Sequence, residues 1–226
     1  MDRGKFLAVT VLCAALSIPT IINAAVINFN DAPTHISGGE SIGPIYSESG
    51  FNVSTKENAG VFSLWDGWQS NRGSSNGTTT GFVYNDLYDY EVHFRVSSND
   101  DSAFSIQSID LGEVFNENDS SYYRNGMNGI ITGVRTDGSI VGMSLQLDGV
   151  SDGIGGVEDF ETFSFDSDWT NLSYVDFDFT RDAIGYATYI NFDNIVVSSV
   201  PIPPSLFLFG SGFIGLIGFA RRKHNA

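Results

Sequence analysis

The stretch Tyr90-Glu91-Val92-His93-Phe94-Arg95-Val96 decides the fold class of this chain. Its aromatic and aliphatic residues alternate strictly with charged or ionisable ones, and successive side chains of an extended strand point to opposite faces. One face of the strand is therefore buried and the other is wet, which is typical of an antiparallel sheet. Elsewhere in the sequence, alternation of apolar and polar residues likewise indicates a half-buried strand.

Short β-rich segments recur along the chain and are separated by clusters of Gly, Ser, Asn and Asp. Asp137-Gly138 predicts a hairpin with a two-residue loop between two of them, and no stretch keeps an apolar period of 3.6 residues. The expected strands are 26–29, 51–55, 61–65, 82–84, 90–96, a strand from 104 toward 115, 130–136, 139–147, 160–165, 172–180 and 190–197. Many short strands with frequent turns predict an all-β protein, a two-sheet antiparallel sandwich of the jelly-roll type.

The first 24 residues have the features of a secretory signal peptide. Two basic residues precede an apolar run, residues 6–22, and small residues follow at Ala24 and Ala25, after one of which cleavage is expected. Cys13, the single cysteine, lies inside this signal. The exported protein is therefore expected to have no disulfide, no thiolate metal site and no cysteine nucleophile.

The segment between the two ends, residues 25–199, is predicted to form one domain. It contains six basic and 26 acidic residues, a formal charge of −20, within a chain of −16 overall. Such a surface repels nucleic acid and anionic lipid. It either collects divalent cations or keeps an exported domain soluble.

The C-terminal segment, residues 200–226, differs sharply in composition from the acidic domain. A proline cluster leads into an uncharged apolar run, residues 205–220, and a basic cluster follows. As a helix, these 16 residues cover about 24 Å of a hydrocarbon core of about 30 Å, and the basic end is expected to stay inside. The residues expected to direct sorting and processing are Val200, Pro201, Ile202, Pro203, Pro204, Arg221, Arg222 and Lys223.

This tail resembles the PEP-CTERM sorting signal of Gram-negative bacteria that make exopolysaccharide. Ile202 stands where the family has its glutamate, so the resemblance is to the variant form with an apolar residue between the prolines. The resemblance implies export by the general secretory machinery and transient anchoring in the inner membrane through residues 205–220. It also implies an exosortase as partner, a membrane cysteine transpeptidase that cuts near the prolines and delivers the domain to the cell surface or the extracellular matrix.

The domain itself resembles the β-sandwich domains common in this sorting family, which are similar to carbohydrate-binding and galactose-binding modules. The residues that carry this likeness are Ile27-Asn28-Phe29-Asn30-Asp31 at the first strand and Asn191-Phe192-Asp193-Asn194-Ile195 at the last. In many such jelly rolls a structural Ca²⁺ lies between these two strands. The resemblance therefore implies Asp31 and Asp193, with help from Asn30, as Ca²⁺ ligands.

Other interpretations of the acidic residues remain open. Two side chains are too few for Ca²⁺, which takes six to eight oxygen ligands, and Asp193 with Asn194 would also serve to turn the backbone near the last strand. The loop 148–159, DGVSDGIGGVED, offers oxygen ligands as well. It departs from the EF-hand pattern at Val150 and Asp159, which favours a flexible acidic hairpin loop.

A sugar-binding site is the remaining candidate. Trp65, Asp66 and Trp68 combine flat aromatic faces with a hydrogen-bonding side chain, the mixture that grips sugar rings. The alternative is that both indoles close one end of the sandwich, since tryptophan is usually buried.

No catalytic set is recognisable in the sequence. His35 and His93 stand in neither a Gly-x-Ser-x-Gly elbow nor a His-Glu-x-x-His helix, and no carboxylate pair is marked as that of a glycosidase. The sequence thus favours a non-enzymatic structural or adhesive protein associated with exopolysaccharide. A dedicated carbohydrate-binding module is the alternative, and a polysaccharide hydrolase is a more distant one.

Overall fold

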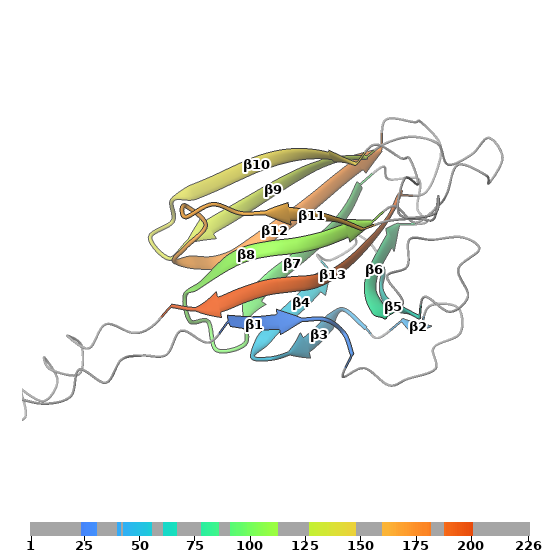
Figure 1. Cartoon of the computed structure of the whole chain (residues 1–226), viewed down its shortest axis with the longest axis horizontal. Helices are drawn as coiled ribbons and strands as arrows, with labels where there is room; N and C mark the ends of the chain where they lie inside the picture. The colour runs from blue at the N-terminus through green and yellow to red at the C-terminus, as the bar shows by residue number, and fades with distance from the viewer. Residues whose placement is uncertain are drawn as a thin grey trace, which may run out of the picture. The chain divides into compact units, whose positions relative to one another are not determined.

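A computed structural model describes residues 24–30, 40–41, 43–55, 61–66, 78–85, 91–112, 127–147, 160–181 and 188–200. Every regular element among them is a β-strand (Figure 1). Residues Asn23–Val200 form one compact unit, called the body below. The described part of the chain holds no helix with the length and apolarity needed to cross a bilayer. The predicted signal segment up to Asn23 and the predicted helix at 205–220 lie outside the described residues.

Thirteen strands follow one another along the described chain. They are β1 (Ala24–Ile27), β2 (Glu40–Ser41), β3 (Ile45–Glu48), β4 (Phe51–Thr55), β5 (Val61–Asp66), β6 (Thr79–Asn85), β7 (Glu91–Ser98), β8 (Phe104–Gly112), β9 (Met127–Arg135), β10 (Ile140–Leu147), β11 (Phe160–Ser164), β12 (Leu172–Arg181) and β13 (Thr188–Ser199). The all-β prediction is confirmed, and each expected strand has a counterpart. The sequence did not predict β2 and β3, which are short and flank Gly43-Pro44.

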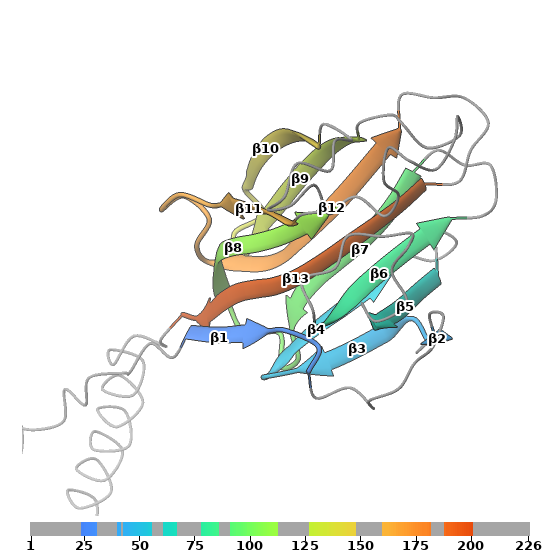
Figure 2. The same ribbon diagram turned by 45° about the vertical axis from the view of Figure 1, so that its right-hand side comes forward.

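Antiparallel pairing arranges these strands in two groups. The first runs β2-β5-β6-β13-β8-β11, with β1 also beside β13, and the second runs β10-β9-β12-β7-β4-β3. Among the described residues, one pair, Leu172 with Phe104, connects β12 to β8 and makes the sheet continuous. The two groups face each other as the layers of a sheet folded over on itself (Figures 1 and 2).

An aromatic stack fills the space between the layers. The ring of Phe94 on β7 lies 4.5 Å from that of Phe177 on β12 and 4.0 Å from that of Phe192 on β13 in the opposite group. All three side chains are fully buried, as are the neighbours of Phe94 on the same face of its strand, Val92 and Val96. The apolar residues Val92, Phe94 and Val96 of β7 therefore help to hold the two layers together.

Two glycines explain local features of the sheet. A Cβ atom added to Gly81 on β6 would lie 2.4 Å from the ring of Phe192, so only glycine lets this ring lie flat against the strand. Gly138 has a φ of 83° and follows a turn in which its N–H donates to the Arg135 carbonyl at 2.9 Å. The predicted hairpin is confirmed, but its loop has three residues and ends in a glycine bulge.

Candidate functional site

The outward faces of β7 and β12 carry a row of paired polar side chains, called the β7–β12 strip below. Each member alternates with a buried core residue of its own strand, and the antiparallel register sets Arg95 opposite Asp176 and His93 opposite Asp178. The strip comprises Glu91, His93 and Arg95 of β7 and Tyr174, Asp176 and Asp178 of β12. The strip thus lies on the outward side of the same two strands whose inward side chains belong to the aromatic core.

Arg95 is the best-fixed side chain of the strip. Its Nε and Nη2 donate to Oδ1 and Oδ2 of Asp176 at 2.7 and 2.9 Å, a bidentate geometry that fixes both groups. Its Cζ lies 3.7 Å from the ring centroid of Tyr174, close enough for a cation–π contact. The hydrogen bond to Asp176 raises the pKa of Arg95 above its ordinary value.

His93 lies between two carboxylates. Its Nδ1 contacts Oδ1 of Asp178 across the strands, and its Nε2 lies 3.2 Å from Oε2 of Glu91 on the same strand. A hydrolase triad instead places the imidazole between a carboxylate and a hydroxyl nucleophile. The arrangement therefore positions charge and hydrogen-bonding groups without forming such a triad.

Small uncharged side chains border the strip on both sides. The register places Ser54 of β4 beside Arg95, and Thr132 of β9 beside Asp176. The exception is Ile130 of β9, which lies opposite Asp178 and is 59% exposed. Hydrogen-bond donors and acceptors thus follow one another across this face of the sheet.

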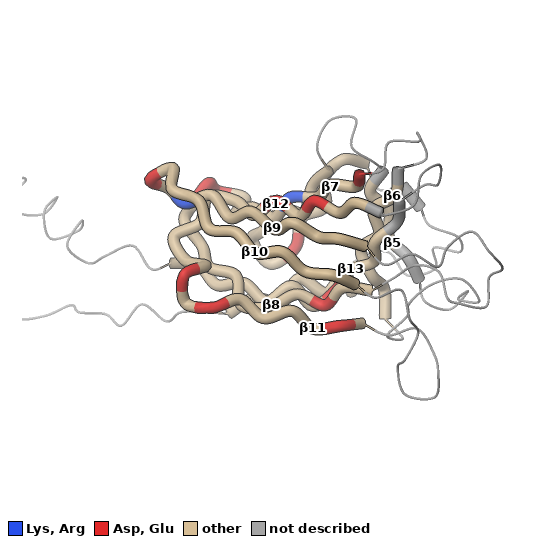
Figure 3. The backbone as a smooth tube through the Cα atoms, turned by 90° about the horizontal axis from the view of Figure 1, so that it is seen from above, with Lys and Arg blue, Asp and Glu red and all other residues tan. Residues whose placement is uncertain are grey.

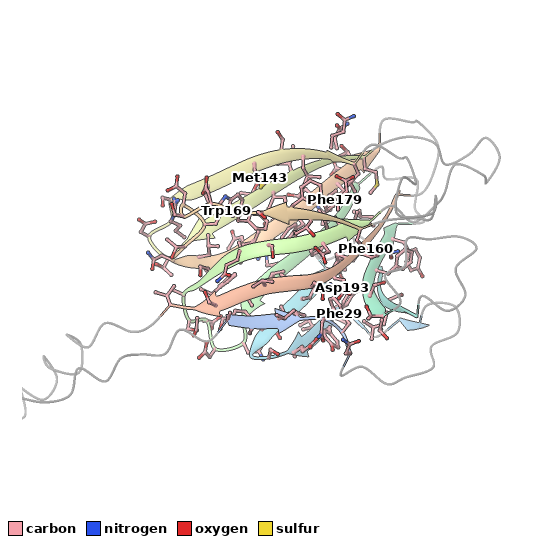
Figure 4. The ribbon with its side chains drawn as sticks, viewed as in Figure 1. Phe29, Met143, Phe160, Trp169, Phe179 and Asp193 are labelled. Atoms are coloured by element: carbon pink, nitrogen blue, oxygen red, sulfur yellow. The ribbon has the colours of Figure 1, made fainter. Side chains whose placement is uncertain are left out.

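The predicted Ca²⁺ residues are not brought together among the described residues. Asp31 lies outside them, and Asn30 is exposed in a turn, where its N–H donates to Oδ1 of Asn28 at 3.2 Å. Asp193 is buried and labelled in Figure 4. No group of three or more His, Cys, Asp or Glu residues in this part of the chain is placed to hold a metal ion.

The contacts of Asp193 match the interpretation that it turns the backbone near the last strand. Its Oδ1 accepts from the backbone N–H of Asn194 at 2.8 Å, and its Oδ2 accepts from the hydroxyl of Thr78 at 3.0 Å. Asn194 has a φ of 47° at a register shift between Asp193 and Val196. Asp193 therefore turns the backbone at an irregularity of β13, as a short polar side chain next to a left-handed residue often does.

The structure describes the other predicted site residues only in part. Trp65 and Asp66 belong to β5 and pair with Thr80 and Thr79 of β6, but their side chains and all of Trp68 lie outside the described residues. The N–H of Val200 donates to the carbonyl of Ala103 at 3.0 Å. The rest of the predicted sorting segment, the loop 148–159 and His35 also lie outside the described residues.

The β7–β12 strip was not predicted from the sequence, although each of its strands shows an alternating pattern there. The signal that could have found it is charge complementarity between two such segments. His93-Phe94-Arg95 carries an imidazole and a guanidinium on either side of a core phenylalanine, and Asp176-Phe177-Asp178 carries carboxylates in the same spacing. Opposite charges in matching alternation favour direct pairing of two strands.

Comparison with known proteins finds similarity to solved structures but no match among family models or curated proteins. A carbohydrate-binding module specific for non-crystalline cellulose is 13% identical, with a TM-score of 0.41 and coverage of 70% of this chain and 93% of that one. A carbohydrate-binding module in complex with β-1,4-galactotriose is 8% identical, with a TM-score of 0.37 and coverage of 67% and 90%. A cyclase from Fischerella sp. TAU is 11% identical, with a TM-score of 0.41 and coverage of 78% and 98%.

Proposed function

We propose that the body is a non-catalytic polysaccharide-binding domain that uses the β7–β12 strip as its contact surface. The observation that carries the proposal is the cross-strand pairing of Arg95 with Asp176 and of His93 with Asp178 on an outward sheet face. Paired charges held on a rigid sheet offer hydrogen bonds to sugar hydroxyls without a large loss of side-chain entropy. We also assign the two-layer arrangement to the jelly-roll class as part of this proposal.

The charge of the domain selects the ligand class. The exported domain has a formal charge of −20, which repels anionic polysaccharides at low ionic strength. The strip pairs the one Arg among its residues, Arg95, with Asp176 and leaves no surplus of positive charge. The proposed ligand is therefore a neutral polysaccharide, whose hydroxyls bond to the carboxylates and to Arg95 and whose pyranose ring packs beside Tyr174.

Binding of the body to a panel of neutral and anionic oligosaccharides tests this proposal. We expect a neutral glycan to bind, and Tyr174→Ala and Asp178→Asn each to weaken its affinity by about 5- to 20-fold through lost packing or a lost acceptor. Thr162→Ala is the matched control, because Thr162 is an exposed residue of β11 in the other group of strands and bonds to Asp110. It should bind normally.

Three outcomes would contradict the proposal. A loss of binding in Trp65→Ala, with Tyr174→Ala unaffected, would move the site to the aromatic segment of β5. Release of reducing sugar by the body would identify a hydrolase, for which Asp176 and Asp178 would be the first candidates. Absence of binding to every member of the panel would leave only a structural role.

Delivery to the surface remains a separate proposal that rests on the resemblance of residues 200–226 to a sorting signal. The exported protein is proposed to be held in the inner membrane through residues 205–220 and processed near Pro201–Pro204 by an exosortase. Replacement of Arg221, Arg222 and Lys223 by serine should leave unprocessed protein in the wild-type host. Equal processing of this variant and the unchanged chain would contradict the assignment.

A further inference from the structure

The edge strand β10 differs from the other edges of the body. Its eight residues, IVGMSLQL, contain no charge and no proline, and it pairs with β9 in a register without a bulge. The other described edge strands are two to five residues long, and both β3 and β11 contain a glutamate. Natural proteins usually protect a long edge with charges, prolines or bulges, because its free backbone groups can pair with another strand.

The hairpin fixes which backbone groups of β10 point to the free edge. The N–H of Arg135 donates to the carbonyl of Ser139. Hydrogen-bonded pairs recur at every second residue of an antiparallel ladder, so the odd-numbered residues of β10 direct their backbone N–H and C=O groups toward β9. The even-numbered residues therefore direct their N–H and C=O groups outward, away from β9. In the described part of the chain, β9 is the only strand that pairs with β10.

The inner side of the same edge is apolar and incompletely covered. Val141, Met143 and Leu145 pack against the core, yet all three keep part of their surface exposed. Figure 4 labels Met143 on β10. A second strand beside β10 would cover this row as well as the free backbone groups, and both effects favour association.

We propose that β10 pairs antiparallel with β10 of a second copy, so that the body is a two-fold symmetric dimer. In this pairing Met143 lies opposite its own copy, Gly142 lies opposite Ser144, and Ile140 lies opposite Gln146. The backbone groups of the even-numbered residues then bond to each other, and each inner-row side chain meets another apolar one, Val141 meeting Leu145. One surface thus fits itself, as a two-fold interface requires.

The charge distribution argues for a second copy at this edge. The body is strongly acidic, so two copies repel each other wherever their charged surfaces meet. The tube of β10 carries neither red nor blue in Figure 3 and offers an approach without opposed charges. Dimerisation through β10 is therefore expected to strengthen with salt, which screens the remaining repulsion.

A dimer of this kind places two β7–β12 strips on one continuous sheet. Both strips lie in the group of strands that β10 terminates, so they face the same side of the extended sheet. A polysaccharide long enough to reach both would bind more tightly than to one, through the raised effective concentration at the second strip. The dimer itself does not depend on the proposed ligand.

Cross-linking through an introduced cysteine tests the pairing directly. The exported domain has no cysteine of its own, and Met143→Cys would place two thiols at a pair whose Cα atoms are about 4.5 Å apart, within the range of a disulfide. The matched control is Ile45→Cys. Ile45 is 56% exposed on β3, the opposite edge of the same group of strands.

We expect Met143→Cys to form a covalent dimer under mild oxidation at micromolar concentration, and Ile45→Cys to remain almost entirely monomeric. Sedimentation of the unchanged body should give a dimer whose dissociation constant falls as salt is added. Met143→Lys should dissociate it, with Ile45→Lys unchanged and cooperative thermal unfolding showing that both variants are folded. Equal cross-linking of the two cysteine variants would overturn the proposal. A monomer at all salt concentrations would do the same.

Discussion

The inward and outward faces of β7 and β12 carry side chains of opposite character, aromatic on one face and charged on the other. On the inward side, Phe94 and Phe177 stack at 4.5 Å and are fully buried. On the outward side, one residue away in each strand, Arg95 and Asp176 form a bidentate pair with side chains 33% and 12% exposed. The comparison separates what holds the layers together from what they present to a ligand.

The two faces are therefore expected to respond differently to substitution. Burial of an aromatic ring stabilises the fold in proportion to the apolar area removed from water. A partly exposed ion pair gains little net free energy, because desolvation and solvent screening offset much of its attraction. The inner face therefore determines stability, and the outer face can serve recognition.

The largest effect is expected for Phe94→Ala. The substitution removes a ring that contacts Phe177, Phe179 and Phe192, and it should lower the free energy of unfolding by about 3–5 kcal/mol through lost burial and the cavity left behind. Urea denaturation followed by tryptophan fluorescence measures the loss. A loss below 1 kcal/mol, roughly that of a surface substitution, would remove the distinction between the two faces.

A smaller effect is expected for Arg95→Ala, which leaves Asp176 without its bidentate partner. We expect a loss of about 1–3 kcal/mol, mostly the cost of a largely buried carboxylate that has lost its charged donor. The double variant with Asp176→Ala should recover part of this loss. A double-mutant cycle in urea gives the coupling free energy, and additive losses would show that the pair is not coupled.

The smallest effect is expected at the exposed turn after β7, where Asp100 accepts from the hydroxyl of Ser98 at 2.6 Å and from the N–H of Ser102 at 3.1 Å. Hydrogen bonds from the side chains of Ser102 and Ser98, and from the N–H of Ser102, lower the pKa of Asp100 to about 2. A lowered pKa in the folded state stabilises the fold above the unfolded pKa, and this contribution is lost as pH falls toward 2.

The advantage of the unchanged body over Asp100→Asn should therefore be constant above about pH 5 and should shrink between about pH 4 and pH 2. Thermal unfolding across this range measures it. Ser98→Ala should reduce the size of this pH dependence, since it removes one of the two side-chain donors. A difference that grows as the pH falls would have the wrong sign.

The sequence allowed the elements of the fold to be predicted but not the site. The alternation of Val92, Phe94 and Val96 with polar residues identified the core face, because period two follows directly from strand geometry. Pairing between β7 and β12 joins residues about 80 positions apart in sequence. Alternation alone does not say which strands become neighbours, so the strip could not be predicted without the pairing of β7 with β12.

Local backbone chemistry limited the prediction in other places. Phe29 has a φ of 57° and is fully buried, with its N–H donating to Oε2 of Glu48 at 2.9 Å. Glu48 lies on β3, which the sequence did not predict, so this anchor of the first strand could not be foreseen. The Ca²⁺ site that the resemblance implies stays a prediction, since Asp31 lies outside the described residues, while Asp193 accepts hydrogen bonds from Asn194 and Thr78.

Chemical-shift mapping of the labelled body would show whether a glycan contacts the outward face of β7 and β12. On titration with the best-binding neutral oligosaccharide, we predict that the amide signals of Glu91–Ser97 and Tyr174–Asp178 shift together, with those of neighbouring β9. Signals of β5 and β6 should stay in place. Shifts confined to β5 and β6, or binding without any shift in β7 and β12, would contradict the account.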